Sequence, residues 1–590
     1  MAYNPGPLTE WPWQGLGNFK YMILAPFVAR SVYSYTTKGS ETRDLSNFMI
    51  FPLLLSRWIH NQIWVSISRF QAARSKHRIV EKGIGFEQVD REENWDDQIL
   101  LSGLFLYLVN WLNHQAKNLP IWRTDGMVII ALLHMLPVEF LYYWLHRALH
   151  HHYLYSRYHS HHHSSIATEP ITSVIHPFAE LLSYFALFAI PLLTTMLTGT
   201  SSIISVFGYF TYIDLMNNMG HCNFEMVPGF LFTLFPPLKY LMYTPSFHSL
   251  HHTQFRTNYS LFLPIYDYIY GTWDTSSDII YESSLRGKEE KTAVVHLTHP
   301  TTPHSIYHLR LGVSWMASRP YASKWYMWIM WPMTWGITLL MGMSDSAFVV
   351  ERNKLNKLKM QTWAIPRYAF QGDELNKTGE IYLLKHPQLK IRIVDGTALT
   401  VAVVLNSIPE GTKQVMMIGC LSKTGYNIIR ILGQRGVQVS IPDSKEFAKV
   451  HSRLPANLQR NVVRCSDREI KVCLVGYGLT KEDQKMAPKG TLFVPFSQFP
   501  PKKLRPIDCI YYSTPAMVVP PNIEDMHTCE NWLPRKVMSA WRVSGIVHAL
   551  EGWDAHECGD TLLNVEQVWQ AALGHGFRPL PPRGTVTLLE

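Results

Sequence analysis

The chain has 590 residues, enough for about four domains of ordinary size, and its formal net charge is +9. Hydrophobic residues make up 47%, aromatic residues 13% and charged residues 17%, whereas a soluble protein carries about 25% charged residues. This composition excludes an intrinsically disordered chain, which has few aromatic and many charged residues. Seven scattered cysteines without a Cys-x-x-Cys pair indicate reduced thiols rather than a disulfide framework.

Six apolar runs in the N-terminal part of the chain predict membrane-spanning helices. They are Tyr21–Tyr35, Phe48–Ile67, Gln98–Leu112, Met127–Leu145, Phe178–Leu197 and Ile203–Met216. A helix needs about 20 residues to cross the hydrocarbon core of a bilayer, so each shorter run alone is also compatible with a buried helix of a soluble protein. Six runs at this low charge density favour a multi-pass membrane domain. Thr198–Ser202 is expected to form the turn between the last two spans.

The basic residues predict which side of the membrane each connection faces. They gather after the second and fourth runs, at Arg74, Lys76, Arg78, Lys82, Arg147 and Arg157. An excess of Lys and Arg at the ends of spans marks the cytosolic side. We therefore expect residues 71–97, 146–177 and 217–320 to share one cytosolic face. The positive net charge is assigned to these flanks rather than to a nucleic-acid surface.

The C-terminal third has a different pattern. Trp325–Met341 is apolar and rich in Trp and Met, which favours an interfacial or re-entrant segment. From about Gly396 the chain reads as a soluble α/β domain of Rossmann type. We expect strands at 398–405, 414–418, 437–441, 471–475, 492–494 and 507–512, and helices at 426–436 and 534–552. The turn Gly419–Gly425 lacks both the Gly-x-Gly-x-x-Gly and the P-loop spacing, which disfavours a nucleotide site and leaves a regulatory or assembly role.

Histidine is the unusual residue: there are 27, and eight of them lie within residues 146–163. Three clusters have helical spacing. They are His146/His150, His159/His162/His163 and His248/His251/His252. A further candidate, His221, comes shortly after the predicted span Ile203–Met216, just as His146 comes directly after the span Met127–Leu145. Histidines three or four residues apart lie on one face of a helix and can bind one metal. The choice among His150, His151 and His152 stays open, as do roles for His161 and His176.

This histidine set exceeds what one metal needs. A single zinc takes four ligands, whereas eight or nine imidazoles suffice for two metal ions with open positions. Imidazole suits iron, zinc and copper. Because two irons can deliver two electrons to O2 without an organic cofactor, the sequence favours a histidine-rich di-iron site on the cytosolic face.

These motifs resemble those of the fatty-acid hydroxylase/sterol desaturase superfamily of membrane di-iron enzymes. The stretches His146–His152, Tyr158–Ser164, Asn218–Glu225 and Tyr243–Gln254 are similar to the plant eceriferum/glossy-type aldehyde decarbonylases of cuticular wax synthesis. The resemblance covers nearly the whole chain. The three histidine motifs are intact, which places the chain with the alkane-forming branch rather than with a sister branch whose motifs are degraded.

The resemblance implies conversion of very-long-chain aldehydes to alkanes one carbon shorter, with O2 as co-substrate. It implies two irons bound by His146, His150, His159, His162, His163, His248, His251 and His252, with His221 as a ninth ligand. It also implies a cytochrome b5-type electron donor, the sister wax-synthesis protein as partner, a possible homo-oligomer, and an endoplasmic reticulum membrane location with the histidines facing the cytosol.

The predicted architecture is a multi-pass helical membrane domain with a di-iron site, followed by a Rossmann-like α/β domain. Its parts are residues 1–125 (membrane helices), 126–285 (catalytic core), 286–395 (linker) and 396–590 (C-terminal domain). Three other functions remain open: a fatty-acyl or sterol hydroxylase or desaturase on the same irons, a non-catalytic membrane partner of an active paralogue, and a nucleotide-dependent reductase in the C-terminal domain.

Overall fold

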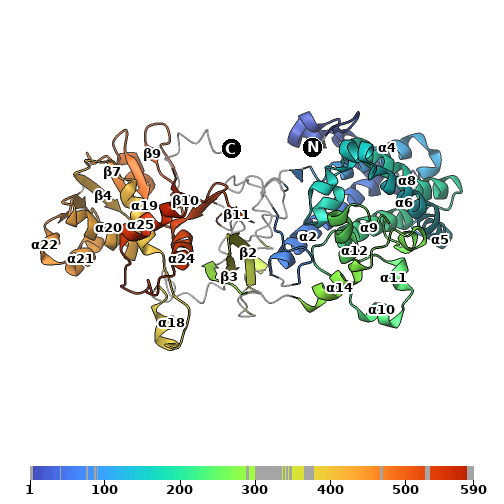
Figure 1. The fold of residues 1–590 in the computed structure, drawn as a ribbon. Coiled ribbons are helices and arrows are strands. Elements are labelled where there is room, and N and C mark those ends of the chain that lie inside the picture. The colour runs from blue at the N-terminus through green and yellow to red at the C-terminus, as the bar shows by residue number, and fades with distance from the viewer. Residues whose placement is uncertain are drawn as a thin grey trace. The chain divides into compact units, whose positions relative to one another are not determined.

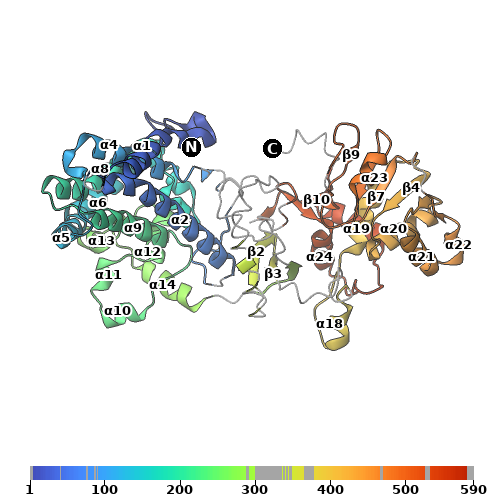
Figure 2. The ribbon, with the colours of Figure 1, turned by 180° about the vertical axis from the view of Figure 1, so that it is seen from behind.

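The computed structural model describes residues 4–39, 42–74, 77–84, 88, 91–92, 94–287, 291–298, 348–364, 378–465, 469–501, 503–524, 530 and 532–580, with isolated positions between 332 and 343. These residues divide into two compact units, one up to residue 287 and one from residue 291 onward. The first is helical and the second is built on β-sheets with helices around them (Figure 1, Figure 2). The four-part boundaries expected from the sequence stay a prediction.

The first unit is a bundle of helices joined by short turns. Its longer helices are α1 (Ala25–Thr37), α2 (Leu45–Arg74), α4 (Asp97–Leu112), α5 (Thr124–Leu133), α6 (Glu139–Leu149), α8 (Phe178–Leu197), α9 (Ile203–Gly220), α12 (Pro245–Gln254) and α14 (Ser276–Arg286). Shorter helices are α7 (His152–Leu154), α10 (Phe230–Leu234), α11 (Leu238–Leu241) and α13 (Ile265–Tyr270). Segments of 3-10 or π helix are η1 (Gln14–Ile23), η2 (His114–Ala116), η3 (His134–Val138), η4 (Tyr155–His159), η5 (His162–Ser164) and η6 (Pro170–Val174).

Each of the six predicted apolar runs is helical, and the predicted turn lies between α8 and α9. Among the described residues, two helical stretches are long and apolar enough to cross a membrane by length and composition: Thr124–Leu149 and Phe178–Leu197. Helix α4, with 16 residues, is shorter than a typical span. Helix α2 is longer but carries polar side chains, including Arg57 and Asn61, along its buried face.

Buried ion pairs fix α2 against its neighbours. Arg57 donates from Nε and Nη2 to the two carboxylate oxygens of Asp214 on α9, both at 2.8 Å, and from Nη1 to Ser102 on α4. Farther along α2, Arg69 donates to Glu169 at 2.6 Å. Charged groups inside an apolar bundle must be paired, because an unpaired buried charge is costly. The Arg57–Asp214 pair thereby fixes α9, at whose end His221 lies.

The second unit contains a six-stranded sheet in which all pairs are parallel, with the order β6-β5-β4-β7-β8-β9. Its strands are β4 (Gln414–Ile418), β5 (Gln438–Ser440), β6 (Val462–Val463), β7 (Val472–Val475), β8 (Leu492–Pro495) and β9 (Ile510–Tyr511). Two smaller sheets contain β1 (Val294–Thr298), β3 (Leu358–Ala364), β2 (Phe348–Leu355) and β11 (Ile523–Glu524), and β12 (Val537–Ser539), β10 (Ala516–Val518) and β13 (Arg578–Pro579). Its helices are α18 (Glu380–Lys385), α19 (Thr397–Asn406), α20 (Lys423–Gln434), α21 (Ser444–Arg453), α22 (Ala456–Gln459), α23 (Lys481–Met486), α24 (Ala540–Glu551) and α25 (Val565–Gly574).

The α/β character of this region is confirmed, but one predicted strand is wrong. Residues 398–405 form helix α19, whose side chains are buried on all sides. Ala398 and Leu399 pack in one hydrophobic core of the unit, whereas Val401 and Val404 pack in another. A helix between two cores shows no polar face, and its short apolar run therefore resembles a buried strand. The predicted helix at 534–552 begins later, after strand β12. Trp325–Met341 lies outside the described residues, apart from isolated positions.

Candidate metal centre

The first histidine motif lies at the end of α6. His146 is in the last turn of the helix, His150 follows its last residue, and the ring centroids of the two are 5.1 Å apart. His151 and His152 are exposed and belong to neither group of converging histidines. The structure therefore selects His150 from the three adjacent histidines, which sequence spacing alone left open.

The second and third motifs approach this point from other elements. His159 ends the π turn η4, and His162 and His163 lie in the 3-10 turn η5 directly after it. Helix α12 carries His248, His251 and His252; it begins at Pro245 because the Thr244 side chain caps it by accepting from the Phe247 amide. His221 caps the C-terminus of α9.

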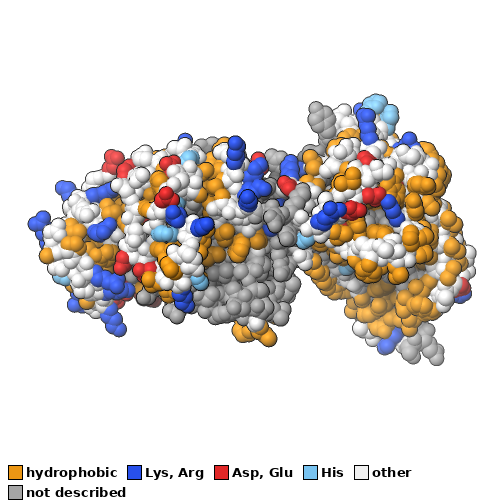
Figure 3. Space-filling model, turned by 60° about the horizontal axis from the view of Figure 1, so that its bottom comes forward, with side chains coloured by type: hydrophobic (Ala, Val, Ile, Leu, Met, Phe, Trp, Pro, Cys, Tyr) orange, Lys and Arg blue, Asp and Glu red, His pale blue; other side chains and the backbone are white. Residues whose placement is uncertain are grey.

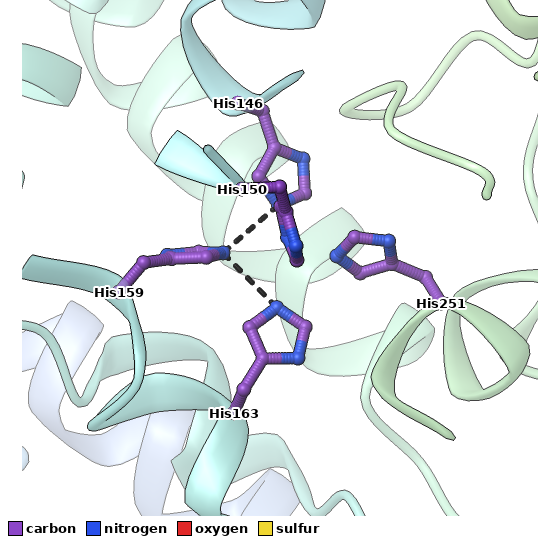
Figure 4. A group of neighbouring side chains, drawn as sticks. All are labelled: His146, His150, His159, His163 and His251. Atoms are coloured by element: carbon purple, nitrogen blue, oxygen red, sulfur yellow. Dashed lines mark hydrogen bonds between the residues drawn. The ribbon is translucent and has the colours of Figure 1, made fainter. Parts of the chain in front are cut away.

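All nine predicted histidines come together, and they form two groups. His146, His150, His159, His163 and His251 form a five-histidine group, and His162, His221, His248 and His252 form a four-histidine group. In each group the candidate ligand nitrogens lie within 4.8 Å of one another. Figure 4 shows the rings of the five-histidine group turned toward a common point. Except for His150, each of the nine residues is 5% exposed or less.

The sorting does not follow the motifs. His162 and His163 are adjacent in the chain but belong to different groups. The same is true of His251 and His252. The rings of the two groups are close together: His163 and His252 stack with centroids 4.4 Å apart. The site is therefore a single centre with two neighbouring sets of donors.

Backbone carbonyls fix the tautomers of several rings. His146 Nδ1 lies 2.7 Å from the carbonyl oxygen of Tyr259, and His251 Nδ1 lies 2.7 Å from that of Thr257. A carbonyl oxygen only accepts, so in both rings Nδ1 carries the hydrogen and Nε2 presents a lone pair to the centre. Such contacts are typical of metal-binding histidines, whose second nitrogen is held by a carbonyl or carboxylate.

Glu180 plays the same part for His159, and sequence reasoning did not assign it a role. Its Oε1 accepts from His159 Nδ1 at 2.7 Å, from His176 Nδ1 at 3.1 Å and from the Tyr184 hydroxyl at 2.7 Å. His176 in turn stacks on His162, with centroids 4.5 Å apart. The available signal was a charged residue within the otherwise apolar run 178–197, which usually marks a functional group in a membrane helix.

The geometry fits metal ions better than hydrogen bonds between histidines. His146 and His159 both donate from Nδ1, to Tyr259 and Glu180, so their Nε2 lone pairs face each other at 3.2 Å. Two lone pairs at this distance need a cation between them. Imidazole nitrogens that bind one metal side by side at about 2.1 Å lie about 3 Å apart. Among the nine histidines, the buried nitrogens without a hydrogen-bond partner are His150 Nε2, His162 Nδ1, His163 Nδ1, His248 Nδ1, His251 Nε2 and both ring nitrogens of His252.

Burial keeps these rings neutral, which is the form that binds metal. Desolvation lowers the pKa of His221 to about 3. The pKa values of His162, His163, His251 and His252 are lowered well below 6.5, first by burial and then by the neighbouring imidazoles. No proton therefore competes for the lone pairs near neutral pH, and the donor set is the nitrogen-rich type that suits iron, copper or zinc.

Comparison with known proteins agrees with this site. Residues 131–272 match the model of the fatty acid hydroxylase family, and residues 415–579 match that of the CER1-like C-terminal domain. The first match contains all nine histidines, within a run that also includes α6, α8, α9 and α12. Fold and site thus define a protein of the fatty acid hydroxylase class.

Relatives that match along their full length show which family within the fatty acid hydroxylase class this chain resembles. The chain is 55% identical to the very-long-chain aldehyde decarbonylase CER1 of Arabidopsis thaliana, over 98% of this chain and 99% of the relative. It is 55% identical to the very-long-chain aldehyde decarbonylase GL1-5 of Oryza sativa subsp. indica, over 98% and 100%, and 52% identical to GL1-7 of subsp. japonica, over 98% of both. The chain belongs to this family of plant very-long-chain aldehyde decarbonylases.

Proposed function

We propose that this protein converts very-long-chain aldehydes to alkanes one carbon shorter in cuticular wax synthesis. The observation that carries the proposal is the double group of buried, neutral imidazoles in a chain 55% identical to named aldehyde decarbonylases along its whole length. Reaction chemistry is assigned to the site rather than to the fold, because one fold supports many activities.

The two histidine groups would each hold one iron ion. The five-histidine group offers His146, His150, His159, His163 and His251, and the four-histidine group offers His162, His221, His248 and His252. When bound, the iron pair supplies the redox chemistry with which O2, the co-substrate, is reduced. The electrons come from an external cytochrome b5-type donor.

The surrounding residues orient and insulate this centre. The carbonyls of Thr257 and Tyr259 hold His251 and His146 with Nε2 facing inward, and the Glu180 carboxylate does the same for His159. Burial excludes water and protons from the rings, so their nitrogens stay available as ligands. The apolar helices of the unit accommodate the alkyl chain, since each buried methylene contributes about 0.8 kcal/mol.

The first unit is proposed to lie in the endoplasmic reticulum membrane as a multi-pass domain, with the histidines facing the cytosol. Large apolar side chains are exposed on several of its helices, for example Phe51 on α2, Leu108 on α4, Leu132 on α5 and Trp144 on α6. Figure 3 shows hydrophobic side chains gathered in broad areas on one face of this unit. Apolar surface of this extent is unfavourable in water and fits a lipid environment.

The six-stranded sheet of the second unit is proposed to be of Rossmann type, because its order places the first strand at the centre with later strands on both sides. The loop after β4, where a Rossmann-type sheet would bind a nucleotide, has its backbone amides bonded within the protein. The Cys420 amide donates to the Tyr477 carbonyl at 2.7 Å, and the Leu421 amide donates to the Glu446 carboxylate at 3.0 Å. These loop amides would face a bound pyrophosphate, so the contacts disfavour the reductase alternative and favour a regulatory or assembly role, as partner of the sister wax-synthesis protein or of a second copy.

The deciding experiment is lipid profiling of a heterologous host that expresses the chain and is supplied with long deuterated aldehydes. Deuterated alkanes one carbon shorter support the proposal. Hydroxylated or desaturated lipids without alkanes would instead assign the same site to a hydroxylase or desaturase. Co-expression of the sister protein and a cytochrome b5 should raise the alkane yield.

Metal analysis of the purified protein tests the non-catalytic alternative. The proposal requires about two irons per chain, and a chain with an intact fold that binds none after loading with Fe(II) would be a scaffold. Replacing His248 by alanine should remove iron from the four-histidine group, while the exposed His152→Ala serves as a matched control that leaves the iron content unchanged.

A further inference from the structure

A small apolar pocket lies in the first unit among α2, α4, α8 and α9, away from the histidines. Its lining includes Met49 and Leu53 on α2, Leu106 on α4, Met196 on α8 and Val206 on α9, together with Ala116 of η2. Apolar clefts of this kind are the common form of sites for apolar ligands. The described histidine residues do not line it.

The pocket and the histidine centre lie at opposite ends of the same two helices. On α8, Glu180 contacts His159 near the first residue and Met196 lines the pocket near the last. These positions are sixteen residues apart, which corresponds to about 24 Å along an α-helix. On α9, Val206 lines the pocket and His221 caps the far end, which corresponds to about 22 Å. Two helices thus give the same separation.

This separation has a chemical meaning for an alkyl chain. With C–C bonds of about 1.5 Å and near-tetrahedral angles, each carbon of an extended chain advances it by about 1.25 Å. A chain whose carbonyl end is at the histidines therefore needs about 19 carbons to reach the pocket. A fatty aldehyde of about 16 carbons is too short to reach the pocket.

We propose that this pocket binds the methyl end of the very-long-chain substrate and so selects for chain length. The inference rests on the proposed function, since it takes the aldehyde as the ligand and the histidine centre as its reacting end. Substrates of more than about 20 carbons place their last methylenes in the pocket, and each methylene buried there raises affinity about fourfold.

The polar residues of the pocket support a methyl group as the occupant. Two of its lining residues are polar, and both already have hydrogen-bond partners within the protein. Asn110 donates to the Ala116 carbonyl at 3.0 Å and accepts from Asn47 at 2.6 Å, and Ser46 accepts from the Leu119 amide at 2.7 Å. Both polar side chains are thus engaged in hydrogen bonds within the protein, which suits a terminal CH3 and disfavours a polar end group.

Photo-crosslinking tests the location directly. The probe is a fatty aldehyde of about 28 carbons with a diazirine on its terminal carbons, presented to the full-length protein in membrane vesicles. We expect labelled peptides from residues 46–53, 106–119 and 196–207, and no labelling there by a probe of about 16 carbons. Labels confined to other helices, or equal labelling by the short probe, would overturn the proposal.

Substitutions that fill the pocket give an independent readout. Val206→Phe and Ala116→Leu should each displace about two methylenes and lower the ratio of kcat/KM for the long aldehyde over the short one by about 15-fold. The control is Ile204→Phe, on the same turn of α9 but 38% exposed, which should leave the ratio unchanged. An unchanged ratio in the two filled variants contradicts the proposal. If the wild-type protein forms no alkane at all, the proposed function fails, while the crosslinking result still decides whether the pocket binds the chain end.

Discussion

Replacing Glu180 tests whether the buried carboxylate orients the metal site. Three donors bond to its Oε1: His159 Nδ1, His176 Nδ1 and the Tyr184 hydroxyl. Glu180→Leu leaves all three buried donors unpaired, at about 1–3 kcal/mol each, so the free energy of unfolding should fall by about 3 kcal/mol or more. Glu180→Gln keeps the shape and an accepting oxygen but removes the charge that holds the His159 ring.

Because such partners of metal-bound histidines typically account for 10–100-fold in metal affinity or activity, we expect Glu180→Gln to lower iron affinity by about that factor with a near-normal melting temperature. Chelator competition followed by metal analysis measures the affinity, and thermal unfolding in detergent measures the stability. Asp97→Asn is the matched control: it removes a buried carboxylate that bonds to Lys20 and Trp13 instead of a histidine, and it should reduce stability without changing iron affinity. Wild-type iron affinity in Glu180→Gln would refute the role assigned to the carboxylate.

The remaining predictions concern the histidines and the second unit. His162→Ala and His251→Ala should each abolish alkane formation, with iron loss measured by metal analysis and membrane insertion retained; activity surviving in both would contradict the assignment. In the second unit, burial and then the nearby Asp395 raise the pKa of Glu557 to about 8. The folded state therefore holds a proton that the unfolded chain releases near pH 4.5, so the free energy of unfolding should fall by up to about 1.4 kcal/mol per pH unit from pH 4.5 to 8. Glu557→Gln should flatten this slope in urea titrations; an unchanged slope would refute it. NADPH at 1 mM should leave the melting temperature of the protein unchanged, whereas a clear rise would reopen the reductase alternative.

The histidines of the metal centre could be predicted because their spacing along the chain is typical of metal ligands. Histidines three and four residues apart share a helix face, and the flanking apolar runs indicated which connections meet. The sorting into two groups could not be predicted, because adjacent residues such as His162 and His163 point to different groups only once η5 has packed against α12. For the same reason spacing could not choose between His150 and its two neighbours.

Other features depend on partners that are distant in the chain. Glu180 was visible as a charge in an apolar run, but its role follows from its contact with His159, twenty-one residues away, and with His176. Helix α19 was predicted as a strand because its apolar residues show no helical periodicity. The periodicity is absent because the helix packs against a hydrophobic core on either side. Hydrophobic periodicity indicates a helix when one of its faces is buried and the other is polar. A helix that is buried on every face shows no such periodicity.

The division of adjacent histidines between the two groups has a consequence for assembly of the centre. An ion bound by His163 and His251 would immobilise the same short stretches of backbone that carry His162 and His252. The entropy of ordering those stretches is then lost only once, so the second ion would bind a preformed site. Filling of the two positions should therefore be cooperative, and iron titrations should pass from empty to doubly filled chains with few singly filled ones.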